Sequence, residues 1–308
     1  MIKNTVFFGN GLNYIGEGKI SWTNLLQNIK GKQFDDNLLP NTLTYERIIL
    51  DKYSGKTILS QEYYVKEEIA DLMRKVEPSS IYESLYTLNF ENYITTNYDY
   101  GFIISAERLN EVNSIQNDVE DSEKIYSIRR VKRISNKKEK KKLFWQIHGE
   151  IDLPASIMLG LDQYCKYIRR IAEYFEGRYT YTKDTETIKE KSMNEKILKT
   201  EFSGSSWIEL FFTTNVHIIG FSLDFCEIDL WWLLNKRARM KKSEDVGKHI
   251  KNEIHFYCPE ESDPEKKKLL VQKTELLKSF GVIVHIHKLN TGKKFPDLKF
   301  YEDILNGI

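Results

Sequence analysis

Four apolar runs of the chain each end in small or polar residues of the kind that bind ligands or carry out chemistry. They are the segments VFFGNGLN, YITTNYD, FWQIHGE and VHIIGFSLD, which begin at Val6, Tyr93, Phe144 and Val216. Continuous apolar runs of this length predict buried parallel strands. In an open parallel sheet, ligands bind beyond the carboxyl ends of the strands. The four polar ends are therefore expected to line one crevice.

The first segment places two glycines around an asparagine, Gly9-Asn10-Gly11, where the strand stops. One glycine would suit a turn that needs a positive φ, whereas two would let the backbone approach a ligand such as a phosphate closely. The segment lacks the third glycine of the dinucleotide fingerprint, and no acidic residue clearly closes a second strand about twenty residues later. By itself such a pair of glycines is more often a turn than a binding loop.

The other three segments also have structural alternatives. Asn97 and Asp99 could cap a helix, and Ser222 and Asp224 could cap the apolar helix LDFCEIDLWWLL. His148 could be a hydrogen-bonded buried histidine or, at the end of a strand with polar residues at its tip, a catalytic group. Each segment alone leaves both interpretations open.

A scaffold of alternating strands and helices is needed to bring the segments together. Six apolar runs predict strands at 5–8, 93–96, 143–147, 216–219, 254–257 and 282–286. Helical patterns lie between these runs, which indicates an α/β fold. We expect a Rossmann-like parallel sheet of about six strands flanked by helices, with helical insertions.

Capping residues and apolar spacing predict several of these helices. Ser21 is expected to cap a helix that starts after it and stops at Gly31, and YYVKEEIADLMRKV is expected to form another. A later helix should end before Gly281, which is suited to a C-terminal cap. One face of that helix is marked by Leu269, Lys273, Leu276 and Phe280.

We expect residues 1–308 to form a single domain, with helical insertions at about 31–90 and about 165–210. The second insertion could cap a site. Residues 129–142, RRVKRISNKKEKKK, follow an acidic stretch, and these adjacent opposite charges predict a solvated loop. A contact for nucleic acid is the alternative, but the run lacks interleaved aromatic residues that would stack on bases.

The composition argues against several classes of protein. The 46 Lys+Arg residues balance 45 Asp+Glu residues, so the charge predicts neither a nucleic-acid coat nor a membrane-surface protein. The start MIKNTVFF does not fit a signal peptide, and no run approaches the ~20 apolar residues that span a bilayer. Neither the scattered Cys165, Cys226 and Cys258 nor His285 and His287 predict a metal site. We expect a cytoplasmic protein without zinc.

Taken together and in this order, the four segments resemble the sirtuin-like family of NAD-consuming proteins. The family's Gly-Ala-Gly-Ile-Ser turn corresponds to Gly9-Asn10-Gly11-Leu12-Asn13, and its Thr-Gln-Asn-Ile-Asp segment to Thr95-Thr96-Asn97-Tyr98-Asp99. Its catalytic His-Gly pair corresponds to His148-Gly149, and its Gly-Thr-Ser-Leu segment to Gly220-Phe221-Ser222-Leu223. The resemblance spans most of the chain but depends on these segments, and it does not account for the helical insertions.

The closer resemblance is to the divergent sirtuin-like domains of prokaryotic antiphage defence, which favour Gly-Asn-Gly in the first turn and lack the zinc module. Such domains have a strand and an Asp-Tyr type of helix start after the His-Gly pair, for which 156–159 and 162–164 are the candidates. Three cysteines cannot build the four-cysteine ribbon of protein deacylases, and Thr96 replaces the family's glutamine. Hydrolysis of NAD needs no peptide groove, so the resemblance implies an NAD hydrolase.

The resemblance also implies a role for each site residue, with NAD as the substrate. Asn97 would position the ribose or the attacking water, and His148 would act as a base on a ribose hydroxyl or on that water. Asp99 would lie near the nicotinamide carboxamide. The leaving nicotinamide is already cationic, so no general acid is required. The NAD-binding residues implied in this way are Gly9, Asn10, Gly11, Asn13, Thr96, Asp99, Gly220 and Ser222.

The resemblance further implies regulation, because uncontrolled loss of NAD kills the host cell in abortive infection. Self-assembly or a partner such as a ring-forming ATPase often holds such effectors inactive, so a homo-oligomer is expected. Trp231 and Trp232 are either buried on all sides or part of a subunit interface. Glu260 could reach an adenosine ribose. The alternatives are a deacylase or ADP-ribosyltransferase, and a non-catalytic NAD sensor that assembles with an effector.

Overall fold

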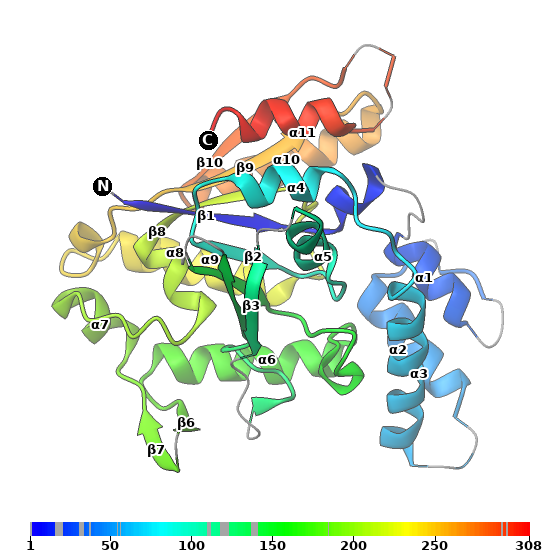
Figure 1. Cartoon of the computed structure of the whole chain (residues 1–308), viewed down its shortest axis with the longest axis horizontal. Helices are drawn as coiled ribbons and strands as arrows, with labels where there is room; N and C mark the ends of the chain where they lie inside the picture. The colour runs from blue at the N-terminus through cyan, green and yellow to red at the C-terminus, as the bar shows by residue number, and fades with distance from the viewer. Residues whose placement is uncertain are drawn as a thin grey trace.

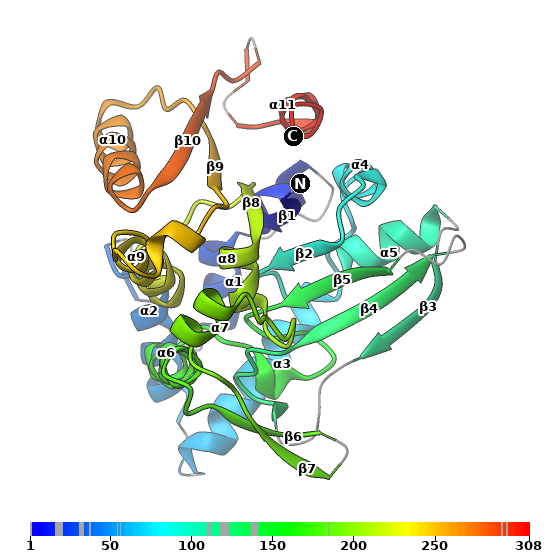
Figure 2. The same ribbon diagram turned by 90° about the vertical axis from the view of Figure 1, so that its left-hand side faces the viewer.

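The structure is a computed structural model, and it describes residues 2–15, 21–30, 34–36, 38–53, 55, 57–109, 112–117, 123–136, 141–183, 185–290, 292–293 and 295–308. Its main feature is an eight-stranded sheet with the order β10-β9-β8-β1-β2-β5-β4-β3 (Figure 1, Figure 2). The strands are β1 (Lys3–Phe8), β2 (Asn92–Thr95), β3 (Val112–Asn117), β4 (Val131–Asn136), β5 (Lys141–Gln146), β8 (Thr214–Ile219), β9 (Ile254–Pro259) and β10 (Val282–His287).

The six predicted strands are all present, and they pair in parallel from β10 to β5, which confirms the Rossmann-like α/β fold. Central β1 lies between β2 and β8, with Phe7 opposite Ile94 on one side and Ile218 on the other. These three side chains are buried, because helices cover both faces of the sheet. The strands that precede the four polar segments are the neighbours β8, β1, β2 and β5, so their carboxyl ends meet at one edge.

The prediction of a solvated loop over 129–142 is wrong for β4, which pairs with β5 and with β3 as an antiparallel extension of the sheet. Strands β3 and β4 are the seventh and eighth strands of the sheet, and the sequence predicted neither. The charged sequence hid β4, because Arg130 just before this strand and Lys132 within it are buried in ion pairs. Arg130 and Lys132 each lie 2.6 Å from a carboxylate oxygen of Glu150. Residues 137–140 of the predicted loop lie outside the described residues.

Helices cover both faces of this sheet. They are α1 (Trp22–Ile29), α2 (Asn41–Asp51), α3 (Ile58–Met73), α4 (Ile81–Thr87), α5 (Gly101–Arg108), α6 (Leu161–Phe175), α7 (Met193–Lys199), α8 (Leu210–Thr213), α9 (Ile228–Lys241), α10 (Pro264–Ser279) and α11 (Leu298–Leu305). Figure 2 shows α4, α5 and α11 on one side of the sheet and α6 and α9 on the other. No helix in the described part of the chain is long and apolar enough to cross a membrane.

The cap prediction for α1 is confirmed, since the Ser21 hydroxyl accepts a hydrogen bond of 2.9 Å from the Asn24 N–H. The face of α10 that Leu269 and Leu276 mark is not the buried one: both side chains are exposed, whereas Thr274 and Leu277 are buried. This helix has apolar side chains in two neighbouring columns, and it packs beside the edge strand β10. The packing of α10 against β10 determines which of these two columns of side chains is buried.

The insertion predicted at about 31–90 contains the helices α2, α3 and α4, and the first two pack with α1 in a cluster that also includes Tyr98 and Ile157. Helices α1, α2 and α3 pack around Leu25, Ile48 and Ile69, and they lie at the right of Figure 1. Helix α4, by contrast, packs with α5 and α11 in a layer on the sheet.

The second insertion, at about 165–210, is not wholly helical, because β6 (Thr180–Lys183) and β7 (Glu186–Lys189) form a hairpin within it. The strand expected at 156–159 is absent. Pro154 begins a short 3-10 helix, η3 (Pro154–Ser156), and the Met158 N–H then donates to the His148 carbonyl. The helix start expected at 162–164 is present, since α6 begins at Leu161.

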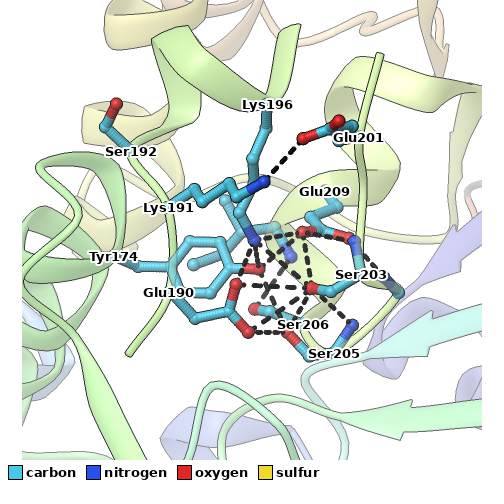
Figure 3. Close-up of polar contacts among 12 residues, drawn as sticks. Tyr174, Glu190, Lys191, Ser192, Lys196, Glu201, Ser203, Ser205, Ser206 and Glu209 are labelled. Atoms are coloured by element: carbon cyan, nitrogen blue, oxygen red, sulfur yellow. Dashed lines mark hydrogen bonds and ion pairs between the residues drawn. The ribbon is translucent and has the colours of Figure 1, made fainter. Parts of the chain in front are cut away.

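A buried lysine links the elements of this second insertion (Figure 3). Lys196 of α7 is 1% exposed, and its Nζ lies 2.6 Å from Oε1 of Glu209 and beside the carboxylate of Glu190. The same Nζ donates to the Tyr174 hydroxyl of α6 at 2.8 Å. The ammonium group of Lys196 in α7 thus contacts α6 through Tyr174, the segment just after β7 through Glu190 and the segment before α8 through Glu209.

Candidate functional site

A cavity of about 560 Å³ lies at the edge of the sheet where the polar segments end. Asn10 and Gly11 line it after β1, His148 after β5, and Gly220 and Ser222 after β8. The start of α1 and the start of α2 cover one side, and α10 and α11 form another part of the wall. None of the described residues of 165–210 lines the cavity, so that insertion does not cap it.

The two glycines of the first segment let two strand ends touch. A Cβ on Gly11 would lie 2.5 Å from the carbonyl oxygen of Gly220, and a Cβ on Gly9 would lie 2.4 Å from the Phe221 ring. The Gly11 N–H donates to that Gly220 carbonyl at 2.8 Å, and Gly220 has a φ of +61°. Both glycines are therefore required by packing between the turns after β1 and β8, and the Gly11 N–H already has a protein acceptor.

Several predicted site residues lie beneath the cavity in a buried hydrogen-bond network. Asn13 donates to Asp99 at 3.0 Å and accepts from the Tyr82 hydroxyl at 2.7 Å, and Asn97 donates to the same hydroxyl at 3.2 Å. Asp99 also accepts from the N–H of Gly101, the first residue of α5, but Tyr100 is the N-cap of that helix, so the capping alternative is wrong for Asp99. Burial raises the pKa of Asp99. The Oδ1 of Asn97 is buried and has no hydrogen-bond partner among the described residues.

The structure thus divides the predicted site into two groups. Those that line the cavity are Asn10, Gly11, His148, Gly220 and Ser222. Those that do not line it are Gly9, Asn13, Thr96, Asn97 and Asp99, and the last four of these are buried.

His148 lies between two carboxylates. Its Nε2 is 2.9 Å from Oδ2 of Asp229, and its Nδ1 is 3.6 Å from Oε2 of Glu227. Burial would lower the pKa of His148, but the Asp229 charge and hydrogen bond and the Glu227 charge outweigh it, so the pKa is raised. The imidazole is accordingly held in its cationic form to a higher pH than a free histidine.

Glu227 and Asp229 are the functional candidates that the sequence did not reveal. Burial, together with the neighbouring Asp229 charge, outweighs the opposing effect of His148 and raises the pKa of Glu227 to about 7. The Tyr164 hydroxyl donates to the Glu227 carboxylate at 2.8 Å. Asp229 is fully buried, and its Oδ1 has no partner among the described residues. An aspartate in the apolar run EIDLWWLL was the available signal, because a buried charge requires a partner.

The alternative that Ser222 and Asp224 cap the following helix is wrong, because α9 begins at Ile228 with Glu227 before it. Asp224 instead accepts from the Cys226 N–H at 2.9 Å, within the turn that leads to the helix. Asp224 also lines the cavity together with Ser222.

Within the described part of the chain, His148, Glu227 and Asp229 are the one group whose ligand-type atoms all lie within 4.8 Å of one another. The two carboxylates face different nitrogens of the imidazole, whereas a metal ion would bind one of them. The arrangement therefore suits shared protons better than a metal ion. The three cysteines are free, and burial raises the pKa of Cys258 in the cavity wall to about 11.

His285 of β10 lies in a row with His255 and His217 of the neighbouring strands, which the sequence did not predict. His285 forms a 3.0 Å contact between its Nε2 and the Nδ1 of His255, and the His255 ring stacks on His217. Burial lowers the pKa of His217 to about 4. A hydrogen-bonded row of largely neutral imidazoles suits a structural role.

Two further predicted residues also have defined places. Trp231 stacks on Phe225 with ring centroids 5.5 Å apart, and Trp232 packs edge-on against Phe175 at 5.3 Å. Both tryptophans are only partly buried, so they are not enclosed on all sides. Glu260 donates its N–H to the His287 carbonyl and lies outside the cavity lining.

No protein-family model matches the chain, and a comparison with curated proteins found no match. The geometry of the cavity and the chemistry of its residues therefore carry the functional assignment.

Proposed function

We propose that the chain hydrolyses NAD at the bond between nicotinamide and ribose. The observation that carries the proposal is the cavity, where three segments of sirtuin-like sequence bring Gly11, His148 and Gly220 to one wall. Its volume of about 560 Å³ lies in the range of pockets for small molecules and cofactors. Its position beyond the carboxyl ends of parallel strands is the usual place for a nucleotide ligand.

In the proposed reaction, the bond from the ribose carbon to nicotinamide breaks, and its electron pair leaves with nicotinamide, which becomes neutral. The ribose carbon gains positive charge in the transition state, and a water oxygen forms the new bond. The proton of that water is released, so the products are nicotinamide, ADP-ribose and a proton. Carboxylates near His148 would stabilise the positive charge as it develops.

The part of the cavity wall formed by β9, α10 and α11 would take the adenosine. Phe300 and Tyr301 of α11 and Tyr257 of β9 supply aromatic surface there, and Lys266 and Lys273 of α10 supply positive charge for the phosphates. The Lys273 Nζ also donates to the Ser222 carbonyl at 3.1 Å, so this lysine connects α10 with the turn after β8.

Incubation of the purified chain with NAD, followed by chromatography of the products, tests the proposal. We expect equal amounts of nicotinamide and ADP-ribose, and a loss of about 100-fold or more in His148→Ala. His249→Ala is the matched control, because His249 is exposed and lies outside the cavity. Asn97→Ala tests whether the buried network contributes.

The proposal is wrong if NAD survives unchanged with the parent chain, both alone and in lysate of phage-infected cells. ADP-ribose found on a protein would identify a transferase instead, and removal of an acyl group a deacylase. Binding of NAD without turnover in the same assays would identify a sensor.

We further propose that the chain acts in antiphage defence by depleting NAD in the cytoplasm, as an oligomer or with a partner such as an ATPase. The support is the resemblance of the four segments. Phage infection of cells that express the parent chain should lower cellular NAD, and His148→Ala should abolish this. Light scattering of Trp231→Ala tests whether the partly buried tryptophans lie in a subunit interface.

A further inference from the structure

The surroundings of His148 conflict with a role as the base in this reaction. A general base needs a free lone pair, and each imidazole nitrogen here faces a carboxylate oxygen, at 2.9 Å for Nε2 and 3.6 Å for Nδ1. Two acceptors on opposite sides of one imidazole favour a proton on both nitrogens. A histidine held in this way attracts negative charge and cannot accept a further proton.

Glu227 is the group beside His148 that can accept one. It lies before the first residue of α9, lines the cavity and retains partial exposure, whereas Asp229 is fully buried and does not line it. The hydroxyl of Tyr164, a residue of α6, donates a hydrogen bond to the Glu227 carboxylate. The titratable and charged groups that face Glu227 from the surrounding elements are Tyr98, His148, Tyr164, Asp224 and Asp229.

We propose that Glu227 is the general base of this site, and that His148 and Asp229 form a pair that positions its carboxylate. The inference rests on the proposed hydrolysis of NAD. As nicotinamide leaves with its electron pair, the water oxygen bonds to the ribose carbon and a water proton passes to the Glu227 carboxylate. Glu227 then returns the proton to solvent through the cavity, which restores the starting state.

The electrostatics of the cluster agree with this division of roles. Burial raises the pKa of Glu227 to about 7, where a carboxylate is both available and basic enough to accept a proton at neutral pH. The neighbouring carboxylates raise the pKa of His148, which favours its cationic form. One buried cation between two carboxylates leaves a net negative site, which favours a developing ribosyl cation.

Steady-state kinetics of Glu227→Gln and Glu227→Asp test the assignment, with Glu244→Gln as an exposed control beyond the end of α9. We expect Glu227→Gln to lower kcat by about 100-fold or more, to change KM by less than about 3-fold, and to lose the rise in rate with pH near neutrality. Glu227→Asp should recover part of the rate. A Glu227→Gln variant with the kcat and pH profile of the parent overturns the proposal.

A titration of the NAD-free protein separates this inference from the proposed function. Carbon-13 NMR of labelled carboxyl and imidazole groups should show a carboxyl that titrates near pH 7 and disappears in Glu227→Gln, while His148 stays protonated through that range. If the carboxyl titrates with ordinary glutamates and His148 is neutral at pH 7, the assignment is wrong even in an active enzyme. If the titration is as expected but the parent consumes no NAD, the proposed function is wrong. The catalytic role of Glu227 is then wrong as well, because it depends on that function.

Discussion

Replacement of Lys196 by methionine should cost the protein much of its stability. Lys196 is 1% exposed, and the carboxylates of Glu190 and Glu209 beside it are 6% and 2% exposed. Methionine keeps the length of the side chain but removes the charge and three hydrogen-bond donors. Two buried carboxylates would then face each other without a cation.

The expected loss follows from this burial. Removal of one partner from a buried ion pair costs about 3–5 kcal/mol, because the remaining charge stays desolvated. Two carboxylates depend on Lys196, and the Tyr174 hydroxyl loses a donor as well, so we expect the upper part of that range. Urea unfolding followed by tryptophan fluorescence measures the loss, since Trp207 lies in the same packed core.

Lys191→Met is the matched control, because Lys191 and Glu201 form a 2.6 Å pair in the same region with both side chains about half exposed (Figure 3). Its effect should be far smaller, since water and salt screen an exposed pair. The triple variant Lys196→Met, Glu190→Gln, Glu209→Gln should regain most of the lost stability, because it leaves no unpaired charge. If Lys196→Met unfolds at the same urea concentration as Lys191→Met, the reasoning is refuted.

Three other substitutions test the site. Gly11→Ala should lower the melting temperature in calorimetry, because its Cβ would lie 2.5 Å from the carbonyl oxygen of Gly220; an unchanged melting temperature would contradict the close packing of the two turns. Asp229→Asn should lower the pKa of His148 in an NMR titration, and an unchanged value would mean that the Asp229 charge is not what raises it. The free energy of unfolding should fall as pH rises from about 4.5 to about 7, because folded Glu227 binds its proton more tightly than the unfolded chain does. Glu227→Gln should remove that slope, and a slope that persists in this variant would contradict the assignment.

The sequence was sufficient to predict the parallel core of the sheet. Strands buried on both faces are apolar without alternation, and this pattern is clear in Val6, Phe7 and Phe8 of β1. The first helix was also predictable, because a serine before an apolar stripe is a local signal. Strand β4 was not predictable, because a run of charged residues normally indicates a solvent-exposed segment. Here ion pairs with Glu150 allow the cations to be buried.

The candidate site was predictable only in part. The order of the polar segments indicated one crevice, and β8, β1, β2 and β5 are indeed neighbours with their carboxyl ends at one edge. The sequence could not show that Asn97 and Asp99 lie beneath the cavity, because burial at a strand end depends on the helices packed above it. Nor could it show that Gly11 packs on Gly220, which is more than 200 residues away in the chain.

Local patterns of the sequence by itself determined the six parallel strands, the cap of α1 and the residues at the strand ends. Tertiary structure decided which column of α10 is buried and which carboxylates meet His148. The physical reason is the range of the interactions. Backbone preference and apolar periodicity act over a few residues, whereas the pKa values of His148 and Glu227 depend on burial and on charges that only folding brings within 4 Å.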